Sequence, residues 1–258
     1  MPSNPEIIIT EDPIQLAERA ANVFGSTAKD CVMQTDLFTV AISGGSTPRD
    51  MHKLLAEEPY RSGIPWKKTH IFWVDERCVG VDDPASNFGL ARRDFLERIP
   101  IPPEQIHPMP GEFAPEEGAK NYQGEMEKIF QTKEDDLPIF DLIFLGMGKD
   151  GHTASLFPGA KSSHPPWRWV IAVKGGDPNV YRLTLTYNVL NRAKRVCFLV
   201  SGKEKAPIVK IVLEKKDIRL PAQEIQPVKG VLIWLLDKEA ASMLSTPSTP
   251  PPQGGEES

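Results

Sequence analysis

One histidine stands where chemistry is most expected, in the glycine-rich segment that follows the apolar run 139–145. The run reads IFDLIFL and continues as GMGKDGHT, which places Asp150 two residues before His152. Histidine takes or gives a proton near neutral pH without a large change in its pKa. Asp150 is close enough in sequence to orient the imidazole or to favour its charged form. A lone histidine is more often structural, but a position among glycines after a buried strand favours a catalytic role for His152.

A second polar cluster, SGGSTPR at 43–49, lies between an apolar run and a segment with helical character. Gly44 and Gly45 let the backbone approach a ligand closely, and a helix that begins near Ser46 offers free N–H groups to an anion. Arg49 adds a positive charge. The segment lacks the Gly-Lys-Ser/Thr ending of a Walker loop. It therefore predicts either an anion-binding turn or a plain strand-to-helix turn capped by a hydroxyl side chain.

Two further charged clusters follow apolar runs. Asp75, Glu76 and Arg77 come directly after HIFWV, and such a cluster can hold a sugar hydroxyl, a phosphate or a catalytic water. Lys205 follows VCFLV within SGKEKA, where it can supply a point charge to phosphate, and Arg182 in YRLTLT could join it. Taken singly, residues 75–77 are more often a solvated loop, and Lys205 and Arg182 are ordinary surface cations.

The glycines after the 139–145 run match the dinucleotide fingerprint G-x-G-x-x-G. They are Gly146, Gly148 and Gly151. A dinucleotide-binding loop must open a helix that runs back to a strand ending in an acidic residue. Three prolines in segment 158–168 leave little room for that helix before Trp169, so we reject a nicotinamide site.

Apolar runs that suit strands alternate with segments that suit helices. The expected strands are 7–10, 38–43, 70–74, 139–145, 169–173, 196–200 and 231–236. The expected helices are 13–32, 48–57, 87–98, 116–131 and 206–214, with Ser86 and Asn87 as helix caps. This alternation indicates βαβ units and predicts an α/β fold, a mainly parallel sheet with helices on both faces.

The four polar clusters converge if the sheet is parallel, because ligands bind beyond the carboxyl ends of parallel strands. Together the clusters supply anion-binding backbone, cations, carboxylates and one histidine. The sequence has no cysteine nucleophile beside a base, no G-x-S-x-G elbow and no histidine cluster for a metal. It therefore predicts a metal-free phosphate-ester pocket with one acid–base group.

Length and composition suit one large domain. Residues 1–244 are expected to form a single α/β domain, and the tail 245–258 (STPSTPPPQGGEES) is expected to be disordered because it is too rich in proline, serine and glycine to pack.

The charge and the cysteines suit a cytoplasmic protein without a nucleic-acid partner. The net charge of −5 argues against nucleic acid. Cys31, Cys78 and Cys197 are widely spaced and are expected to be reduced. No apolar stretch approaches the ~20 residues of a membrane span, and the N-terminus does not resemble a signal peptide. No obligatory protein partner is expected.

The motifs together resemble the 6-phosphogluconolactonase family, in order and in spacing, over roughly residues 5–240. They are SGGSTPR, DER followed by SN, GMGKDGHTASLFPG, RLTLTYNVLN and GKEKA. The GMGKDGHTASLFP stretch is the most specific of them. The resemblance implies a Rossmann-like α/β fold and the hydrolysis of 6-phospho-D-glucono-1,5-lactone to 6-phosphogluconate in the oxidative pentose phosphate pathway. It implies neither a metal nor an organic cofactor.

Glucosamine-6-phosphate deaminases and isomerases of the same superfamily share the Gly-Gly turn, the first aspartate and the Asp-Gly-His core. They carry a glutamate five residues after the histidine, and that glutamate serves ring opening and proton transfer. Here Phe157 stands at that position and cannot move a proton, which favours the lactonase. Two alternatives stay open, an isomerase or deaminase acting on an amino-sugar phosphate and a non-catalytic sugar-phosphate sensor.

A mechanistic hypothesis follows for individual residues. His152 is expected to act as general base, and Asp150 to orient it or to shape the loop. Arg77 or backbone N–H groups are expected to stabilise the oxyanion, and Asp75 to hold sugar hydroxyls. The residues expected to bind the 6-phosphate are Gly44, Gly45, Ser46, Arg49, Arg182 and Lys205.

Overall fold

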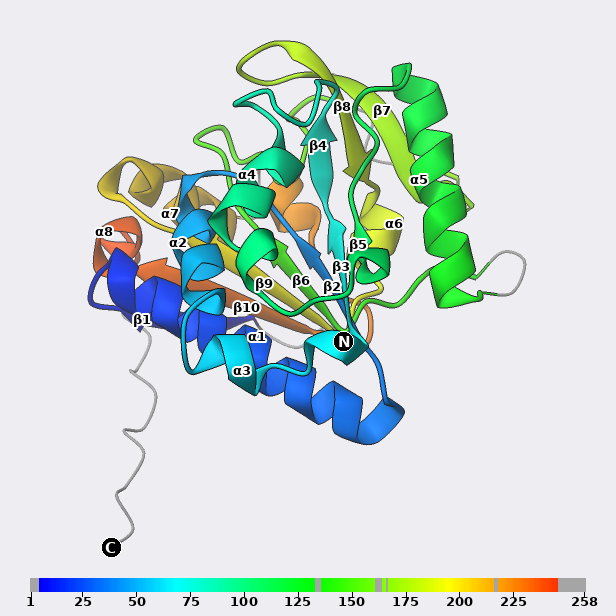
Figure 1. Cartoon of the computed structure of the whole chain (residues 1–258). Helices are drawn as coiled ribbons and strands as arrows, with labels where there is room; N and C mark the ends of the chain where they lie inside the picture. The colour runs from blue at the N-terminus through cyan, green and yellow to red at the C-terminus, as the bar shows by residue number, and fades with distance from the viewer. Residues whose placement is uncertain (1–4, 133–135, 161–163, 166, 216–217, 246–258) are drawn as a thin grey trace, which may run out of the picture.

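A seven-stranded parallel sheet forms the centre of the computed structural model, which describes residues 5–132, 136–160, 164–165, 167–215 and 218–245 (Figure 1). The strands lie in the order β1 (Glu6–Thr10), β10 (Val231–Asp237), β9 (Arg195–Val200), β6 (Leu142–Leu145), β2 (Phe38–Ile42), β3 (Thr69–Trp73) and β5 (Ile106–His107). Every neighbouring pair is parallel.

Helices cover both faces of this sheet. They are α1 (Pro13–Thr35), α2 (Ser46–Leu55), α3 (Tyr60–Gly63), α4 (Asn87–Asp94), α5 (Pro115–Phe130), α6 (Tyr187–Leu190), α7 (Ala206–Glu214) and α8 (Lys238–Ala241). Figure 1 shows α1 to α4 in front of the strands. The connections from β5 to β6, from β6 to β9 and from β9 to β10 cross the sheet in the direction opposite to the earlier connections. Because such crossovers are right-handed, α5, α6 and α7 lie on the other face. The expected Rossmann-like α/β fold is confirmed.

The strand order reverses between β2 and β6. From β2 the chain adds β3 and β5 on one side, and from β6 it adds β9 and β10 on the other. Such a switch point leaves a crevice beyond the carboxyl ends of the two central strands. The glycine turn after β2 and the histidine loop after β6 therefore enter the same crevice.

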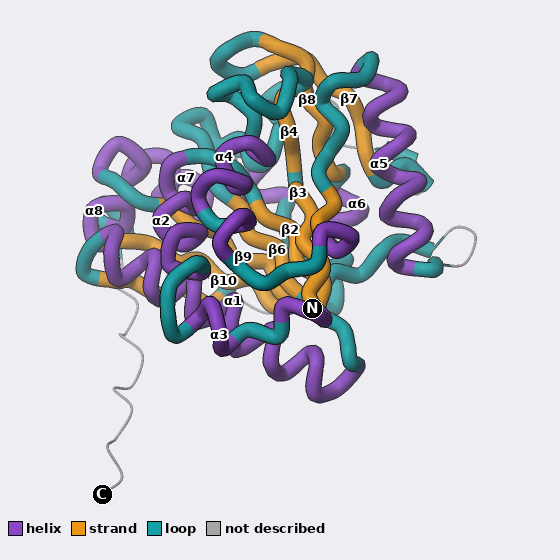
Figure 2. Tube along the Cα trace, viewed as in Figure 1, coloured by secondary structure: helices purple, strands orange, loops and turns teal. Residues whose placement is uncertain are grey.

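A second, antiparallel sheet was not expected. It consists of β4 (Asp75–Arg77), β8 (Val180–Leu185) and β7 (Val170–Gly175), and Figure 2 shows it at the top of the view, beyond the carboxyl ends of the parallel strands. The strand expected at 169–173 belongs to this sheet, and the DER cluster is itself a strand rather than a loop. The β8 strand was missed because Arg182 and Thr184 are polar and yet buried like Leu183 and Leu185, which hides the usual alternation of exposed and buried residues.

The helix expected at 87–98 and the strand expected at 139–145 are both shorter in the structure than expected. The helix expected at 87–98 ends at Asp94, where Phe95 leaves the helical conformation (φ −152°), and a 3-10 turn follows at Leu96–Arg98. Ser86 is the N-cap residue of α4 and accepts a hydrogen bond from the backbone N–H of Gly89, whereas Asn87 lies inside the helix. The expectation that both residues act as caps was therefore wrong for Asn87.

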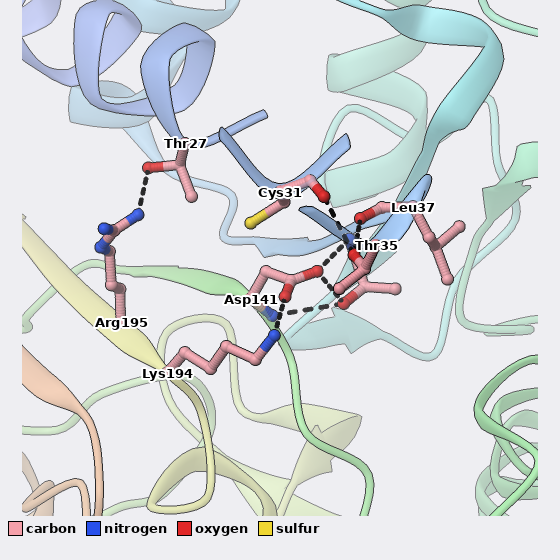
Figure 3. Close-up of polar contacts among 8 residues, drawn as sticks. Thr27, Cys31, Thr35, Leu37, Asp141, Lys194 and Arg195 are labelled. Atoms are coloured by element: carbon pink, nitrogen blue, oxygen red, sulfur yellow. Dashed lines mark hydrogen bonds and ion pairs between the residues drawn. The ribbon is translucent and has the colours of Figure 1, made fainter. Parts of the chain in front are cut away.

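The strand expected at 139–145 begins only at Leu142, because the side chain of Asp141 forms hydrogen bonds with Thr39 near the beginning of β2. Its carboxylate accepts hydrogen bonds from the backbone N–H and the hydroxyl of Thr39, at 2.8 and 3.0 Å, and from Lys194 Nζ at 2.7 Å. Figure 3 shows this carboxylate between Lys194 and the end of α1, where Cys31 lies. Burial, and then the charge of Asp141, raise the pKa of the Cys31 thiol to about 11, so this thiol is protonated at neutral pH.

His52 gives the fold a pH dependence that can be measured. Its ring is 2 % exposed and stacks on Phe95 at 4.9 Å between centroids, and burial lowers its pKa from 6.5 to about 4. Because the pKa of His52 is lower in the folded than in the unfolded protein, protonation of His52 favours unfolding. The free energy of unfolding is therefore highest above pH 6.5 and falls by roughly 3 kcal/mol as the pH is lowered towards 4. Replacing His52 with Gln should flatten the urea-unfolding free energy over this pH range. An unchanged slope would exclude His52 as its source.

The expected domain boundaries stay a prediction. Buried apolar residues of both sheets belong to one contiguous cluster, which includes Leu142 in β6 and Leu183 in β8. The expected disordered tail lies outside the described residues except for Ser245, and segment 158–168 is described only in part. Within the described ranges, no helix is long and apolar enough to cross a membrane.

Candidate active site

A pocket of about 240 Å³ lies at the switch point between β2 and β6. Its walls come from the turn after β2, from β4 and α4, from the loop after β6, from β8 and from the segment between β9 and α7. The predicted site residues among its lining are Gly44, Gly45, Ser46, Asp75, Arg77, His152, Arg182 and Lys205. All four polar clusters therefore meet in one place, although residues 75–77 belong to the second sheet.

His152 is oriented by Asp150. The Asp150 carboxylate lies 2.6 Å from His152 Nδ1 and also accepts the backbone N–H of His152 at 3.1 Å. Burial alone would raise the pKa of Asp150, but the hydrogen bonds and the charge of His152 outweigh burial and lower it. An ionised carboxylate can only accept, so Nδ1 is the protonated nitrogen of a neutral imidazole. The lone pair is then on Nε2, and that nitrogen can act as a base.

Gly148 makes room for this imidazole. A methyl group at Gly148 would lie 2.1 Å from His152 Nδ1 and 2.6 Å from Asp150 Oδ1, distances that no real side chain tolerates. The backbone N–H of Gly148 also donates to the carbonyl of His152 at 2.8 Å. The close approach of backbone to ring, rather than dinucleotide binding, is thus the reason for a glycine at this position.

The loop that carries His152 is connected to β4 by a buried hydrogen bond. Ser155 Oγ donates to Asp75 Oδ2 at 2.7 Å, and both residues are buried. Asp75 also accepts from the side-chain amide of Asn87. Asp75 is therefore rigid, and it holds the strand that carries Arg77 against the loop that carries His152.

Glu76 points away from the pocket and organises its wall. Its carboxylate accepts the backbone N–H groups of Arg77, Asn87 and Phe88 at 2.7 to 2.8 Å and the hydroxyl of Ser86 at 3.1 Å. Burial raises the pKa of Glu76 to about 7 in spite of these donors. Sequence reasoning gave Glu76 no separate role, because only the folded chain brings the beginning of α4 back onto β4.

Arg77 and Arg182 are partners across the β4–β8 pair. Arg182 is 4 % exposed, and it donates through Nε to the carbonyl of Gly175 at 2.9 Å. Burial and then the charge of Arg77 lower the pKa of Arg182. The nearby carboxylates of Asp75, Asp177 and Glu76 act on this pKa in the opposite direction. Phe157 packs between Arg182 and His152. The centre of its ring lies 5.7 Å from the guanidinium carbon of Arg182 and 5.1 Å from the centre of the His152 ring. Both guanidinium groups line the pocket, where they can bind an anion.

Lys205 and the beginning of α2 supply further positive potential. Lys205 Nζ donates to the carbonyl of Met147 at 2.8 Å, and burial lowers its pKa. The N-cap residue of α2 is Gly45 (φ 99°), and no side chain caps this helix. The alternative in which the hydroxyl of Ser46 or Thr47 caps the turn is thus wrong, and the first N–H groups of α2 stay available to an anion.

Arg49 is the predicted phosphate-binding residue that the structure places elsewhere. It does not line the pocket but forms a bidentate ion pair with Asp94 of α4, at 2.7 and 2.9 Å. This pair raises the pKa of Arg49 and lowers that of Asp94. One helical turn beyond Ser46, the side chain of Arg49 reaches the neighbouring helix instead of the site.

No group of three His, Cys, Asp or Glu side chains suited to a metal ion occurs within the described residues. The predicted absence of a metal and of an organic cofactor stays a prediction.

Comparison with known proteins gives a consistent assignment. A sequence model of the family described as glucosamine-6-phosphate isomerases/6-phosphogluconolactonase matches residues 11–234. The chain is 40 % identical over 244 residues to 6-phosphogluconolactonase of Synechocystis sp., covering 93 % of this chain and 98 % of the relative. The solved structure of devB protein aligns with a TM-score of 0.86 at 34 % identity, over 93 % of this chain and 99 % of that one. 6-Phosphogluconolactonase from Trypanosoma cruzi aligns with a TM-score of 0.84 at 28 % identity, over 95 % and 99 %.

Proposed function

This chain belongs to the glucosamine-6-phosphate isomerase/6-phosphogluconolactonase family, and from that premise we propose how its pocket hydrolyses 6-phospho-D-glucono-1,5-lactone to 6-phosphogluconate. The reaction is the opening of a cyclic ester by water, and it belongs to the oxidative pentose phosphate pathway. The observation that carries the assignment of residues is the Asp150–His152 pair, with Nε2 as the basic nitrogen, in the same pocket as Arg77, Arg182 and Lys205.

His152 acts as general base and then as general acid. Nε2 takes a proton from a water molecule while the water oxygen forms a bond to C1 of the lactone. The tetrahedral intermediate collapses by breaking the bond between C1 and the ring oxygen, and the imidazolium returns the proton to that oxygen. Asp150 keeps Nδ1 protonated throughout and stabilises the positive ring. Acid–base assistance of this kind contributes ~10²–10⁴-fold in rate.

Arg77 stabilises the negative oxygen of the intermediate. Its Nη1 is bonded to the carbonyl of Ala85 at 2.6 Å, which fixes the guanidinium, while the buried Nε has no hydrogen-bond acceptor among the described residues. A fixed donor with spare capacity suits a charge that develops only during the reaction. Asp75, held by Ser155 and Asn87, accepts from the hydroxyl groups of the sugar.

The 6-phosphate binds between the glycine turn and the cations. The backbone of Gly44 to Ser46 and the uncapped beginning of α2 supply N–H groups, and Arg182 and Lys205 supply charge.

Replacing Lys205 with Met keeps the length of the side chain and removes its charge. Loss of a charged hydrogen bond of ~1.5–3 kcal/mol should raise KM about ten- to a hundredfold with a smaller change in kcat. Lys203→Met is the matched control, because Lys203 is exposed, belongs to the same turn and does not line the pocket. Equal effects of the two substitutions on KM would contradict a specific phosphate contact.

A coupled assay on freshly made 6-phosphogluconolactone, corrected for spontaneous hydrolysis, tests the function directly. Acceleration over background is expected. Ammonia release from glucosamine 6-phosphate would indicate the deaminase instead, which Phe157 beside the base disfavours. Tight binding of 6-phosphogluconate without acceleration would indicate a sensor.

The remaining expectations concern the setting of the enzyme. We propose a cytoplasmic location, supported by the free thiols of Cys31, Cys78 and Cys197. Some relatives from rice and Arabidopsis are chloroplastic, so fractionation of cells that express the native chain is the appropriate test. We also propose that the enzyme has no nucleic-acid partner and no obligatory protein partner. The net charge of −5 supports the first of these proposals.

A further inference from the structure

Asn87 connects the wall of the pocket to the glycine turn. It is 3 % exposed and forms the first residue of α4. Its backbone N–H donates to Glu76 at 2.8 Å, and its side-chain Nδ2 donates to the backbone carbonyl of Asp75 at 2.9 Å and to the carboxylate at 3.3 Å. Three hydrogen bonds thus attach Asn87 to β4.

These contacts also determine which way the amide faces. Nδ2 lies against two oxygen atoms of Asp75, so the opposite orientation would set an oxygen against oxygens. Oδ1 therefore faces away from β4, towards Gly44. A methyl group built on Gly44 would lie 1.9 Å from Oδ1, 2.3 Å from Cγ and 2.9 Å from Nδ2 of Asn87.

The backbone of Gly44 rests directly on this amide. Oδ1 is buried and has no hydrogen-bond donor among the residues that the structure describes, so its neighbour on that side is the glycine backbone. A Cα–H group that faces a carbonyl oxygen is a weak but recurrent packing contact. Even one methyl group at Gly44 would overlap the Asn87 amide, so the glycine turn packs closely against this side chain.

We propose that Asn87 is a positioning residue that sets the distance between the phosphate-binding turn and Asp75. This proposal rests on the proposed function, in which the turn binds the 6-phosphate and Asp75 binds the sugar hydroxyls. Phosphate and ring belong to one small molecule, so the separation of their two subsites decides whether C1 reaches His152. Small errors of position are costly in rate and in binding.

Asn87→Ala removes the spacer and leaves the proposed catalytic groups unchanged. The Kd for 6-phosphogluconate and the KM for the lactone should rise about tenfold or more, the change expected when one buried polar link of ~1.4 kcal/mol is lost. The shape of the pH profile should stay as in the wild type, because His152 and Asp150 are untouched.

Ser86→Ala is the matched control for helix stability. Ser86 caps the same helix, and it does not line the pocket. Its loss removes the cap and one of the four donors to Glu76, so it should lower Tm and raise Kd much less than Asn87→Ala does. If Asn87→Ala also lowers Tm without raising Kd, the positioning role is wrong and Asn87 is only structural.

A pair of size changes tests the contact itself. Gly44→Ala alone should abolish most phosphate-dependent binding, because its methyl group collides with Asn87. The three nearest atoms in that collision all belong to the Asn87 amide, so Gly44→Ala combined with Asn87→Ala should bind 6-phosphogluconate better than Gly44→Ala alone. Additive losses in the double variant would overturn the proposal.

Asn87→Asp supplies a readout that a packing role would not change. The new carboxylate would face Asp75, so binding should be weak at neutral pH and should recover as the pH falls and the acid becomes a donor. A loss of binding that does not depend on pH would contradict the proposed hydrogen bond to Asp75. Binding experiments need no turnover, so they stay valid if the wild type fails the lactone assay, an outcome that would reject the proposed function alone.

Discussion

Replacement of His152 by alanine should lower kcat by ~10²–10⁴-fold, the contribution of a general acid–base group. The fold should survive, because the side chain lies in a loop, is about one-third exposed (31 %) and is bonded through its ring to Asp150. Binding of 6-phosphogluconate should also survive, since the phosphate subsite comes from the turn after β2, from Arg182 and from Lys205.

Steady-state kinetics with correction for spontaneous hydrolysis, together with calorimetric binding of 6-phosphogluconate, separate these effects. Asp150→Asn serves as the graded companion variant. It keeps a hydrogen-bonding group beside Nδ1 but removes the charge that stabilises the imidazolium, so its kcat should fall between those of the wild type and His152→Ala. Near-normal turnover in His152→Ala would reject His152 as the base.

Gly148→Ala should cause a loss of similar order although it leaves every functional group in place. The added methyl group would lie 2.1 Å from Nδ1 and 2.2 Å from Cε1 of His152, so the ring must move. A displacement of about 1 Å at a catalytic group can cost ~10²-fold in rate. The loss should appear mainly in kcat, because Lys205 contacts this loop through the backbone carbonyl of Met147, which the substitution leaves in place.

Gly146→Ala is the matched control in the same loop, since a methyl group there meets no atom within 4 Å. It narrows the pocket slightly and can raise KM, but it should keep most of kcat. A crystal structure of Gly148→Ala should show the imidazole rotated away from Asp150. Equal kcat values for the two alanine variants would mean that the position of the ring does not limit the reaction.

Much of the site was predictable because its residues are close together in the sequence. The glycines, Asp150 and His152 lie within seven residues after β6, and their order alone indicates a loop that carries a base. The cluster 43–49 was predictable for the same reason. The parallel sheet then brings these two segments together, since β2 and β6 are neighbours at the switch point.

Errors occurred where a role depends on contacts between distant segments. Arg49 looked like a phosphate ligand, but the rotation of α2 turns it towards Asp94. Taken singly, Asp75 to Arg77 suited a solvated loop, but pairing with β8 makes them a strand. The partner segment, YRLTLT, lies more than a hundred residues later in the chain. Asn87 looked like a cap, yet its amide lies between β4 and the turn at Gly44.

By itself, the sequence determined the class of fold and the family of reactions, and it indicated His152 as the proposed base, because apolar periodicity and short motifs act over a few residues. Phe157 in place of a glutamate further favoured hydrolysis over isomerisation. Only the tertiary structure decided which cations face the pocket, that β4 belongs to a second sheet, and that the Asn87 amide lies between β4 and the glycine turn. Those features depend on side-chain packing between elements that are far apart in the chain. Local sequence patterns do not indicate which distant elements contact one another.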